Sequence, residues 1–163
     1  MKKLVLFLSL ISIPGVAVAN EVDKKFSVGV GIGAAYSGLG ANFALLTDRD
    51  MKYVSAGCVE YSSFSGSTCG FGAGWIVTDL FNSNSNKHGI GVYVTKAGDE
   101  SYAYLDDSGF KFVKKQYYGA GVSYTYFVNG INKPGFNFGI SAHATNAKYE
   151  GKIQGFFQVG YQF

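Results

Sequence analysis

The sequence predicts an all-β protein, an antiparallel transmembrane barrel of about eight strands that follows a cleaved signal peptide. Three observations lead to the barrel. Bulky apolar residues alternate with small or polar residues along most of the chain, which is the period of a strand. The alternating segments are about 9–13 residues long, enough for a tilted strand to cross hydrocarbon. Turn-forming Asp, Asn, Gly and Pro residues separate the segments.

The first alternating segment, FSVGVGIGAAY at 26–36, shows the pattern clearly. Phe26, Val28 and Ile32 take one parity, whereas the other parity holds mostly glycine and serine. A period of two places these two sets on opposite faces of a strand. We therefore expect one bulky face and one nearly bare face, with the strand continuing to Tyr36.

The same alternation recurs along the chain. It is regular in the later segments and more ambiguous in the second, third and fourth. Because the count is even, both chain ends should lie at one end of the barrel. The seven further strands are expected near 39–47, 51–61, 68–81, 88–96, 116–128, 135–145 and 153–163.

The bare face argues against a strand that faces bulk water. Only 15% of the residues are charged, against about 25% in soluble proteins. A secreted soluble sandwich or a lipocalin-like barrel is the alternative, and it would place its bulky face inward and Lys or Glu outward. The strands hold few charges, and these lie at or near expected strand ends: Lys52, Glu60, Asp79 and Lys96. Hydrocarbon is the environment that this pattern favours, and a sheet in hydrocarbon must close on itself.

The first 19 residues have the three parts of a secretory signal. Two lysines precede an apolar run, and Ala17-Val18-Ala19 supplies a small-x-small cleavage site before Asn20. We expect residues 1–19 to be removed and residues 20–163 to form one domain beyond the inner membrane. Without Lys2 and Lys3 the formal charge is about +1, which gives no footprint for nucleic acid.

The chain ends in GFFQVGYQF, with Phe157, Val159, Tyr161 and Phe163 on one parity. With the leader and the alternation, this ending resembles the small eight-stranded outer-membrane barrels of Gram-negative bacteria, of OmpX/Ail-like architecture. The resemblance implies location in the cell outer membrane, in contact with outer-membrane lipid and lipopolysaccharide. It also implies that these four residues are the signal read by the barrel-assembly machinery.

Eight strands leave a bore that side chains fill, so no open pore is expected. Inward glycines would make room for Tyr93, Tyr117, Phe127 and three glutamines. The outer aromatic residues should form girdles at the two membrane interfaces. They include Tyr36, Trp75, Tyr124, Tyr126, Phe136, Tyr161 and Phe163.

Cys58 and Cys69 flank the turn SSFSGST. Strand parity places both on the bulky face, with residue 58 opposite residue 69. In an oxidising compartment this pair favours a structural disulfide. Two free thiols packed as small apolar groups are the alternative.

The longest connection, about 97–115, is expected to be a hairpin that continues two strands above the membrane. Tyrosines precede the turn Asp107-Ser108-Gly109 and phenylalanines follow it, and an acidic arm faces a basic arm. We expect a structural or surface-interaction role of the adhesion type, with an extracellular protein or other surface ligand as partner. A solvated loop is the alternative; calcium binding by Asp99, Glu100 and the two later acids would lack the usual ligand spacing. The candidate residues are Tyr102, Tyr104, Asp106, Asp107, Phe110, Lys111 and Phe112.

An enzymatic alternative comes from HATNA at 143–147, which resembles the His-x-Ser-Asn stretch of lipid A 3-O-deacylases. The resemblance implies His143 as base, Thr145 in place of the nucleophilic serine and Asn146 at the family's Asn. The family's acid lies on the last strand, which has no carboxylate here, and Glu150 is the only acid nearby. A hydroxyl nucleophile needs a base within hydrogen-bond reach. No nucleotide, metal or haem motif is present, so no cofactor is expected.

Overall fold

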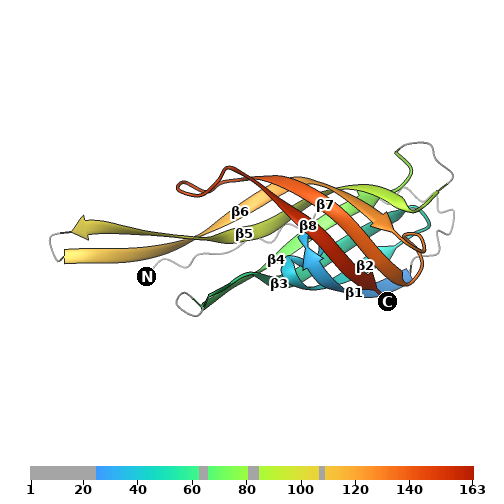
Figure 1. Ribbon diagram of the computed structural model, residues 1–163, viewed down its shortest axis with the longest axis horizontal. Helices are drawn as coiled ribbons and strands as arrows, with labels where there is room; N and C mark the ends of the chain where they lie inside the picture. Colours follow the sequence, from blue (N-terminus) through green and yellow to red (C-terminus); the bar gives the residue numbers. More distant parts are fainter. Residues whose placement is uncertain (1–24, 63–65, 81–84, 107–108) are drawn as a thin grey trace, which may run out of the picture.

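The computed structural model describes residues 25–62, 66–80, 85–106 and 109–163, and the expected leader lies outside them. The chain forms a closed barrel of eight antiparallel strands, in which each strand pairs with the next and β8 pairs with β1 (Figure 1). This confirms the predicted strand count and all-β class. None of the described residues belongs to a helix long and apolar enough to cross a bilayer. The strands are β1 (Lys25–Gly33), β2 (Gly38–Leu46), β3 (Asp50–Ser62), β4 (Gly66–Val77), β5 (His88–Asp106), β6 (Gly109–Phe127), β7 (Gly135–Thr145) and β8 (Ile153–Gln162), with a short 3-10 helix η1 (Ala34–Tyr36) after β1.

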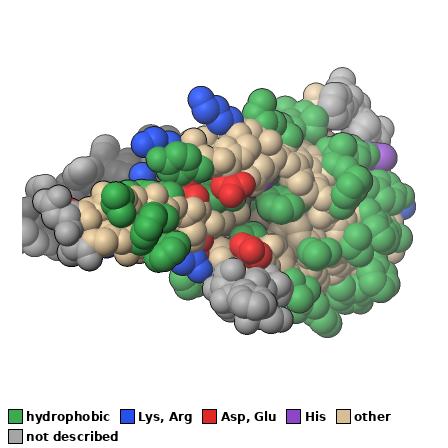
Figure 2. Space-filling view, turned by 60° about the vertical axis from the view of Figure 1, so that its left-hand side comes forward, with side chains coloured by type: hydrophobic (Ala, Val, Ile, Leu, Met, Phe, Trp, Pro, Cys, Tyr) green, Lys and Arg blue, Asp and Glu red, His purple; other side chains and the backbone are tan. Residues whose placement is uncertain are grey.

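The barrel has its apolar side chains on the outside (Figure 2). Phe26 of β1 is 71% exposed, and Val122 of β6, on the opposite wall of the barrel, is 56% exposed. The inward positions instead hold polar residues, several of them almost fully buried: Ser27, Asn42, Thr125, Asn137, Gln158 and Gln162. The distribution is therefore the reverse of that in a soluble β-protein.

Hydrogen bonds pair many of the polar side chains in the interior, and Gln162 Oε1 and His143 Nε2 are buried atoms without such a partner among the described residues. The Gln162 amide nitrogen donates to the Ser27 hydroxyl at 2.8 Å and to Asn42 Oδ1 at 3.2 Å. The Gln158 amide nitrogen donates to Asn137 Oδ1 at 3.2 Å. Because buried polar groups without partners are costly, this network lets the barrel have a polar interior at little energetic penalty.

The connection between β1 and β2 folds into the barrel. Gly33 and Gly38 have positive φ angles of 116° and 94°, and Ser37 between them is left-handed at 55°. These angles end the strand and turn η1 inward, so that Tyr36 is only 1% exposed and its hydroxyl accepts a 2.7 Å hydrogen bond from Asn137 Nδ2. The predictions that the first strand reaches residue 36 and that Tyr36 belongs to an outer girdle are therefore wrong.

The other end of the barrel is closed by its turns. The Asn132 amide donates to Asp48 Oδ1 at 2.8 Å, and the Asn86 amide donates to Asn132 Oδ1 at 3.0 Å. Ile131 is 1% exposed beside these contacts, and its main-chain N–H donates to the Asn86 carbonyl. The three connections at this end are thereby linked to one another.

The fourth strand is shorter than predicted. It ends at Val77 rather than at residue 81. Thr78 follows the strand, and its hydroxyl and its main-chain N–H both donate to the Arg49 carbonyl. This contact ties the end of β4 to the β2–β3 turn.

Few contacts close the sheet between β1 and β8. Only four residue pairs join them, from Gly29↔Gln162 to Ile32↔Val159. The main-chain N–H of Phe163 then donates to the Val28 carbonyl at 2.8 Å, and the Ser27 hydroxyl donates to the Phe163 carbonyl oxygen at 2.7 Å. The last residue of the chain is therefore part of the closure.

The inward turn predicts a clear difference between two glycines of β8. A Cβ at Gly160 would overlap the Tyr36 ring and hydroxyl, whereas one at Gly155 would meet only the Ser141 carbonyl oxygen, at 3.0 Å. We expect Gly160→Ala to lower the free energy of unfolding by about 1–3 kcal/mol because Tyr36 must move. Urea unfolding followed by circular dichroism would measure this, with Gly155→Ala as control; equal stability of both variants would contradict it.

Candidate functional site

A long two-stranded hairpin extends beyond the barrel wall (Figure 1). Strands β5 and β6 pair continuously past the end of the barrel, up to Asp106↔Gly109. Asp107, one of the candidate residues, lies outside the described residues. In this hairpin Ala103 is opposite Phe112 and Leu105 is opposite Phe110.

The two faces of the hairpin differ in chemistry. Ala103, Leu105, Phe110 and Phe112 share the face that continues the outer surface of the barrel, and we call these four residues the apolar face. Leu105, Phe110 and Phe112 are 72%, 77% and 83% exposed. The opposite face holds four other candidates: Tyr102, Tyr104, Asp106 and Lys111, the last two ion-paired with each other.

A β-bulge at the base of the hairpin turns a lysine inward. Lys96 pairs with Tyr118 and Gly98 with Tyr117, so Ala97 is the additional residue. Strand parity without this bulge places Lys96 beside the outward Val94. Instead, Lys96 is 8% exposed, lies over Gly70, and donates from Nζ to the Cys69 carbonyl at 3.1 Å.

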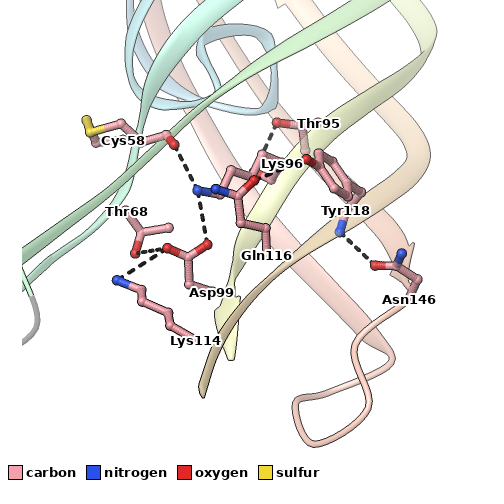
Figure 3. Close-up of polar contacts among 10 residues, drawn as sticks. Cys58, Thr68, Thr95, Lys96, Asp99, Lys114, Gln116, Tyr118 and Asn146 are labelled. Carbon is pink, nitrogen blue, oxygen red and sulfur yellow. Dashed lines mark hydrogen bonds and ion pairs between the residues drawn. A yellow bond between two sulfur atoms is a disulfide. The ribbon is translucent and has the colours of Figure 1, made fainter. Parts of the chain in front are cut away.

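Asp99 links three strands at this base (Figure 3). Its carboxylate lies 3.0 Å from Lys96 Nζ and 3.3 Å from Lys114 Nζ, and it accepts a 3.3 Å hydrogen bond from the Thr68 hydroxyl. Desolvation raises the pKa of Asp99, but hydrogen bonds from both lysines outweigh it and the pKa lies below its ordinary value. One carboxylate between two ammonium groups leaves a local net charge of about +1.

Glu100 anchors the other face of the hairpin. One carboxylate oxygen accepts the main-chain N–H groups of Lys148 at 2.8 Å and of Tyr149 at 3.0 Å. The Tyr102 and Tyr149 rings pack 5.3 Å apart just above. The amide of Tyr149 is the main cause that lowers the pKa of Glu100. The hairpin is thus held by β4 on one side and by the β7–β8 connection on the other.

These acids do not converge on a shared point as calcium ligands would. Asp99 contacts lysines, Glu100 contacts amides, and Asp106 is ion-paired with Lys111. Within the described ranges, no group of three or more His, Cys, Asp or Glu residues is arranged to hold a metal ion.

The predicted disulfide is confirmed. Cys58 lies directly opposite Cys69 in the β3–β4 ladder, in the register that parity predicted, and the two sulfur atoms are bonded. The free-thiol alternative is therefore wrong. Because Lys96 donates to the Cys69 carbonyl, the disulfide lies next to the ion cluster of Asp99.

The three residues of the enzymatic alternative, His143, Thr145 and Glu150, have different contact partners. His143 is inside the barrel, where its Nδ1 shares a 2.8 Å hydrogen bond with the Tyr93 hydroxyl and its ring stacks on Phe156. The Thr145 hydroxyl donates instead to the Gly151 carbonyl at 3.0 Å. Glu150 is exposed in the β7–β8 connection. None of the contacts described for these residues joins base, hydroxyl and acid.

The four residues of the expected assembly signal all lie on the outer face of β8. Phe157 is 83% exposed and Val159 is 46% exposed. The Tyr161 ring packs edge-on between Phe136 at 5.1 Å and Phe163 at 4.9 Å. Phe136, Tyr161 and Phe163 therefore form a connected aromatic cluster on the outer face.

Sequence reasoning missed the contacts that hold the hairpin. Acids on one side of the predicted turn and lysines on the other side were a visible signal for cross-strand pairs such as Glu100↔Lys115. The bulge at Ala97, which brings Lys96 to Asp99, has no such signal. The amide contacts of Glu100 span 48 and 49 residues, and nothing local in the sequence indicates them.

Comparisons of the chain with protein-family models, with curated proteins and with solved structures found no match.

The Glu100 anchor predicts that its charge protects two amides. We expect Glu100→Gln to speed hydrogen exchange of the Lys148 and Tyr149 amides roughly tenfold at neutral pH, because a neutral acceptor is weaker. Since the folded pKa is depressed, the anchor holds at neutral pH and weakens as pH falls through that pKa. Exchange measured by mass spectrometry would test this, with exposed Glu150→Gln as control. Unchanged protection in Glu100→Gln would contradict it.

The disulfide predicts a stability contribution from a short covalent loop. Its cysteines are 11 residues apart, for which chain entropy gives about 2–3 kcal/mol. The double variant Cys58→Ser, Cys69→Ser should lose about this much free energy of unfolding in urea titrations. Reduced wild-type protein is the control and should match the variant; a reduced protein as stable as the oxidised one would rule this contribution out.

Proposed function

We propose that this chain is an exported outer-membrane β-barrel protein with a structural or surface-interaction role of the adhesion type, carried by the β5–β6 hairpin. The observation behind the proposal is that an apolar face on a firmly anchored hairpin projects beyond the barrel. Separate observations support the membrane location, the orientation of the barrel and the role of the hairpin.

The outer surface of the barrel supports placement in lipid. Apolar side chains surround it, and leaving each such side chain in water forgoes about 1.5–3 kcal/mol relative to burial. Polar side chains such as Gln158 and Gln162 point inward and donate hydrogen bonds there. Closure supports the same placement, because a sheet without open edges leaves few main-chain groups unpaired in hydrocarbon.

Strand number supports an extracellular hairpin. Since eight strands bring both ends of the barrel chain to one side, the β5–β6 hairpin lies at the opposite side. Barrels of this class have short periplasmic turns and longer extracellular loops. The connections 47–49, 78–87 and 128–134 lie at the end of the barrel where β1 begins and β8 ends. The long extension of β5 and β6 lies at the other end, which supports the extracellular side for the hairpin.

The packed interior supports a role other than transport through an open pore. Tyr36 and the neighbouring residues of η1 fill the lumen near the hairpin end, and Ile131 fills it near the other end. Between them, Tyr53 and Tyr93 are also buried. An eight-stranded barrel has little bore left after such filling.

The apolar face supports contact with a partner. Each phenylalanine can bury about 150–250 Å² on association, so the two phenylalanines and Leu105 supply the centre of a small interface. The ion cluster of Asp99 and the anchor of Glu100 hold the hairpin, which reduces the entropy cost of binding.

Substitutions on the two hairpin faces test the interaction role. We expect Phe110→Ser, Phe112→Ser to reduce adhesion of expressing cells to protein-coated and hydrophobic surfaces about tenfold or more, because aromatic anchors dominate small interfaces. Tyr104→Ser, on the opposite face, is the matched control and should retain adhesion. Surface labelling of the hairpin would verify export and folding of each variant; equal adhesion of well-exported variants would refute the interaction role.

A further inference from the structure

A shallow apolar groove crosses the outer face of the barrel over β4, β5, β6 and β7. Its volume is about 680 Å³. Ala73, Val94, Ala120 and Ala144 lie side by side on four neighbouring strands and line it, together with the larger side chain Phe71. Small residues at these outward positions leave a channel where other parts of the belt have bulky side chains.

A second groove extends the first toward the other end of the barrel. It has a volume of about 670 Å³ and shares Ala73, Val94 and Ala120 with the first. It reaches Trp75, the only tryptophan of the chain. From Phe71 to Trp75 the track follows about 13 Å of strand, at a rise of about 3.3 Å per residue.

The groove becomes polar at its hairpin end. The main-chain N–H of Tyr118 donates to Asn146 Oδ1 at 2.7 Å, and the Tyr118 hydroxyl donates to Gln116 Oε1 at 3.2 Å (Figure 3). Tyr118 is also the cross-strand partner of Lys96. Lys114 follows on the same outward face, with a side chain 47% exposed. Lys96 faces inward, so Lys114, ion-paired with Asp99, is the cation that the hairpin base presents on the outward face beyond Tyr118.

We propose that this groove binds one acyl chain of an anionic, phosphorylated membrane lipid, with its head group beside Lys114. The inference rests on the proposed membrane location of the barrel. An apolar channel with one cationic end matches an amphiphile whose charge lies at one end of its chain. A positive side chain near a membrane surface attracts anionic lipid, and the contact strengthens where the chain is also accommodated.

The pairing of the strands argues for lipid over a peptide. From Gly72↔Thr95 to Val77↔Ile90 the β4–β5 ladder is paired, and β5–β6 and β6–β7 are paired alongside it. A peptide strand that bound here would find its main-chain partners already used. An acyl chain needs only apolar contact and a matching groove width.

Trp75 allows a direct test in the purified, folded protein. Phosphatidylglycerol brominated near the chain ends would be titrated into protein in a neutral detergent while Trp75 fluorescence is recorded. We expect quenching that saturates at about one lipid per barrel, with about fivefold weaker binding of zwitterionic phosphatidylcholine with the same chains. Quenching that only follows the bulk lipid fraction would overturn the site.

Variants separate the chain contact from the charge contact. Ala120→Phe and Ala144→Phe each fill the groove from an outward position and should abolish saturation. Val30→Phe, on the outer face of β1, is the matched control and should retain it. Lys114→Gln should remove the preference for phosphatidylglycerol; an unchanged preference would overturn the head-group assignment.

The lipid measurement can be interpreted independently of the proposed adhesion role of the hairpin. Circular dichroism would verify the fold of each variant, and two groove-filling variants guard against one that fails to fold. Adhesion depends on the hairpin tip, whereas lipid quenching depends on the groove. Loss of adhesion in the hairpin variants with normal quenching would therefore leave the lipid site intact.

Discussion

Strand β8 returns to β1 through only four residue pairs, and the main-chain N–H of Phe163 extends this seam by one hydrogen bond to Val28. Every other feature requires that seam, because an open sheet would present unpaired N–H and C=O groups along both edges. Once the sheet closes, side chains on the inner face share a lumen of limited volume, whereas side chains on the outer face are not confined by the opposite wall. Glycine and small polar residues fit the first, and bulky apolar residues fit the second.

The seam also explains why the interior is polar and still ordered. Gln158 and Gln162 lie on β8, the strand that completes the closure, and both donate inside the lumen to side chains of nearby strands, Asn137 of β7 and Asn42 of β2. Tyr36 joins the same network from the inward turn after β1. Closure and the internal network therefore support each other, and buried residues such as Tyr53, Ile76 and Tyr93 pack inside the same closed sheet.

The hairpin follows a different physical rule from the barrel. Above the wall it has no neighbouring strands, and isolated two-stranded hairpins are marginally stable in water. Here the buried ion cluster of Asp99 and the amide contacts of Glu100 replace the missing neighbours at its base. This arrangement allows Leu105, Phe110 and Phe112 to remain exposed at the far end without loss of the hairpin's own structure.

Strand alternation was sufficient to predict most of the fold from the sequence. It gave the strand count, the polarity of both faces and the register of Cys58 opposite Cys69, because a period of two fixes every side chain once one is placed. It failed where the backbone leaves that period. Positive φ angles at Gly33 and Gly38 turn Tyr36 inward, and the bulge at Ala97 turns Lys96 inward.

The candidate site was less predictable than the fold. The hairpin and its exposed aromatic residues follow from local pattern, since alternation continues on both sides of a turn. The contacts of Glu100 with Lys148 and Tyr149 and the groove between Ala120 and Ala144 join distant segments. Only the closed sheet brings these segments together, so no local pattern indicates them.

Folding without lipid tests the central claim, that hydrocarbon contacts the outer apolar belt. A chain of residues 20–163 would be diluted from urea into buffer alone and into buffer with phospholipid vesicles, then followed by circular dichroism and vesicle flotation. We expect β-structure and flotation only with vesicles. A folded, monodisperse barrel in buffer alone, which does not float with vesicles, would contradict the account.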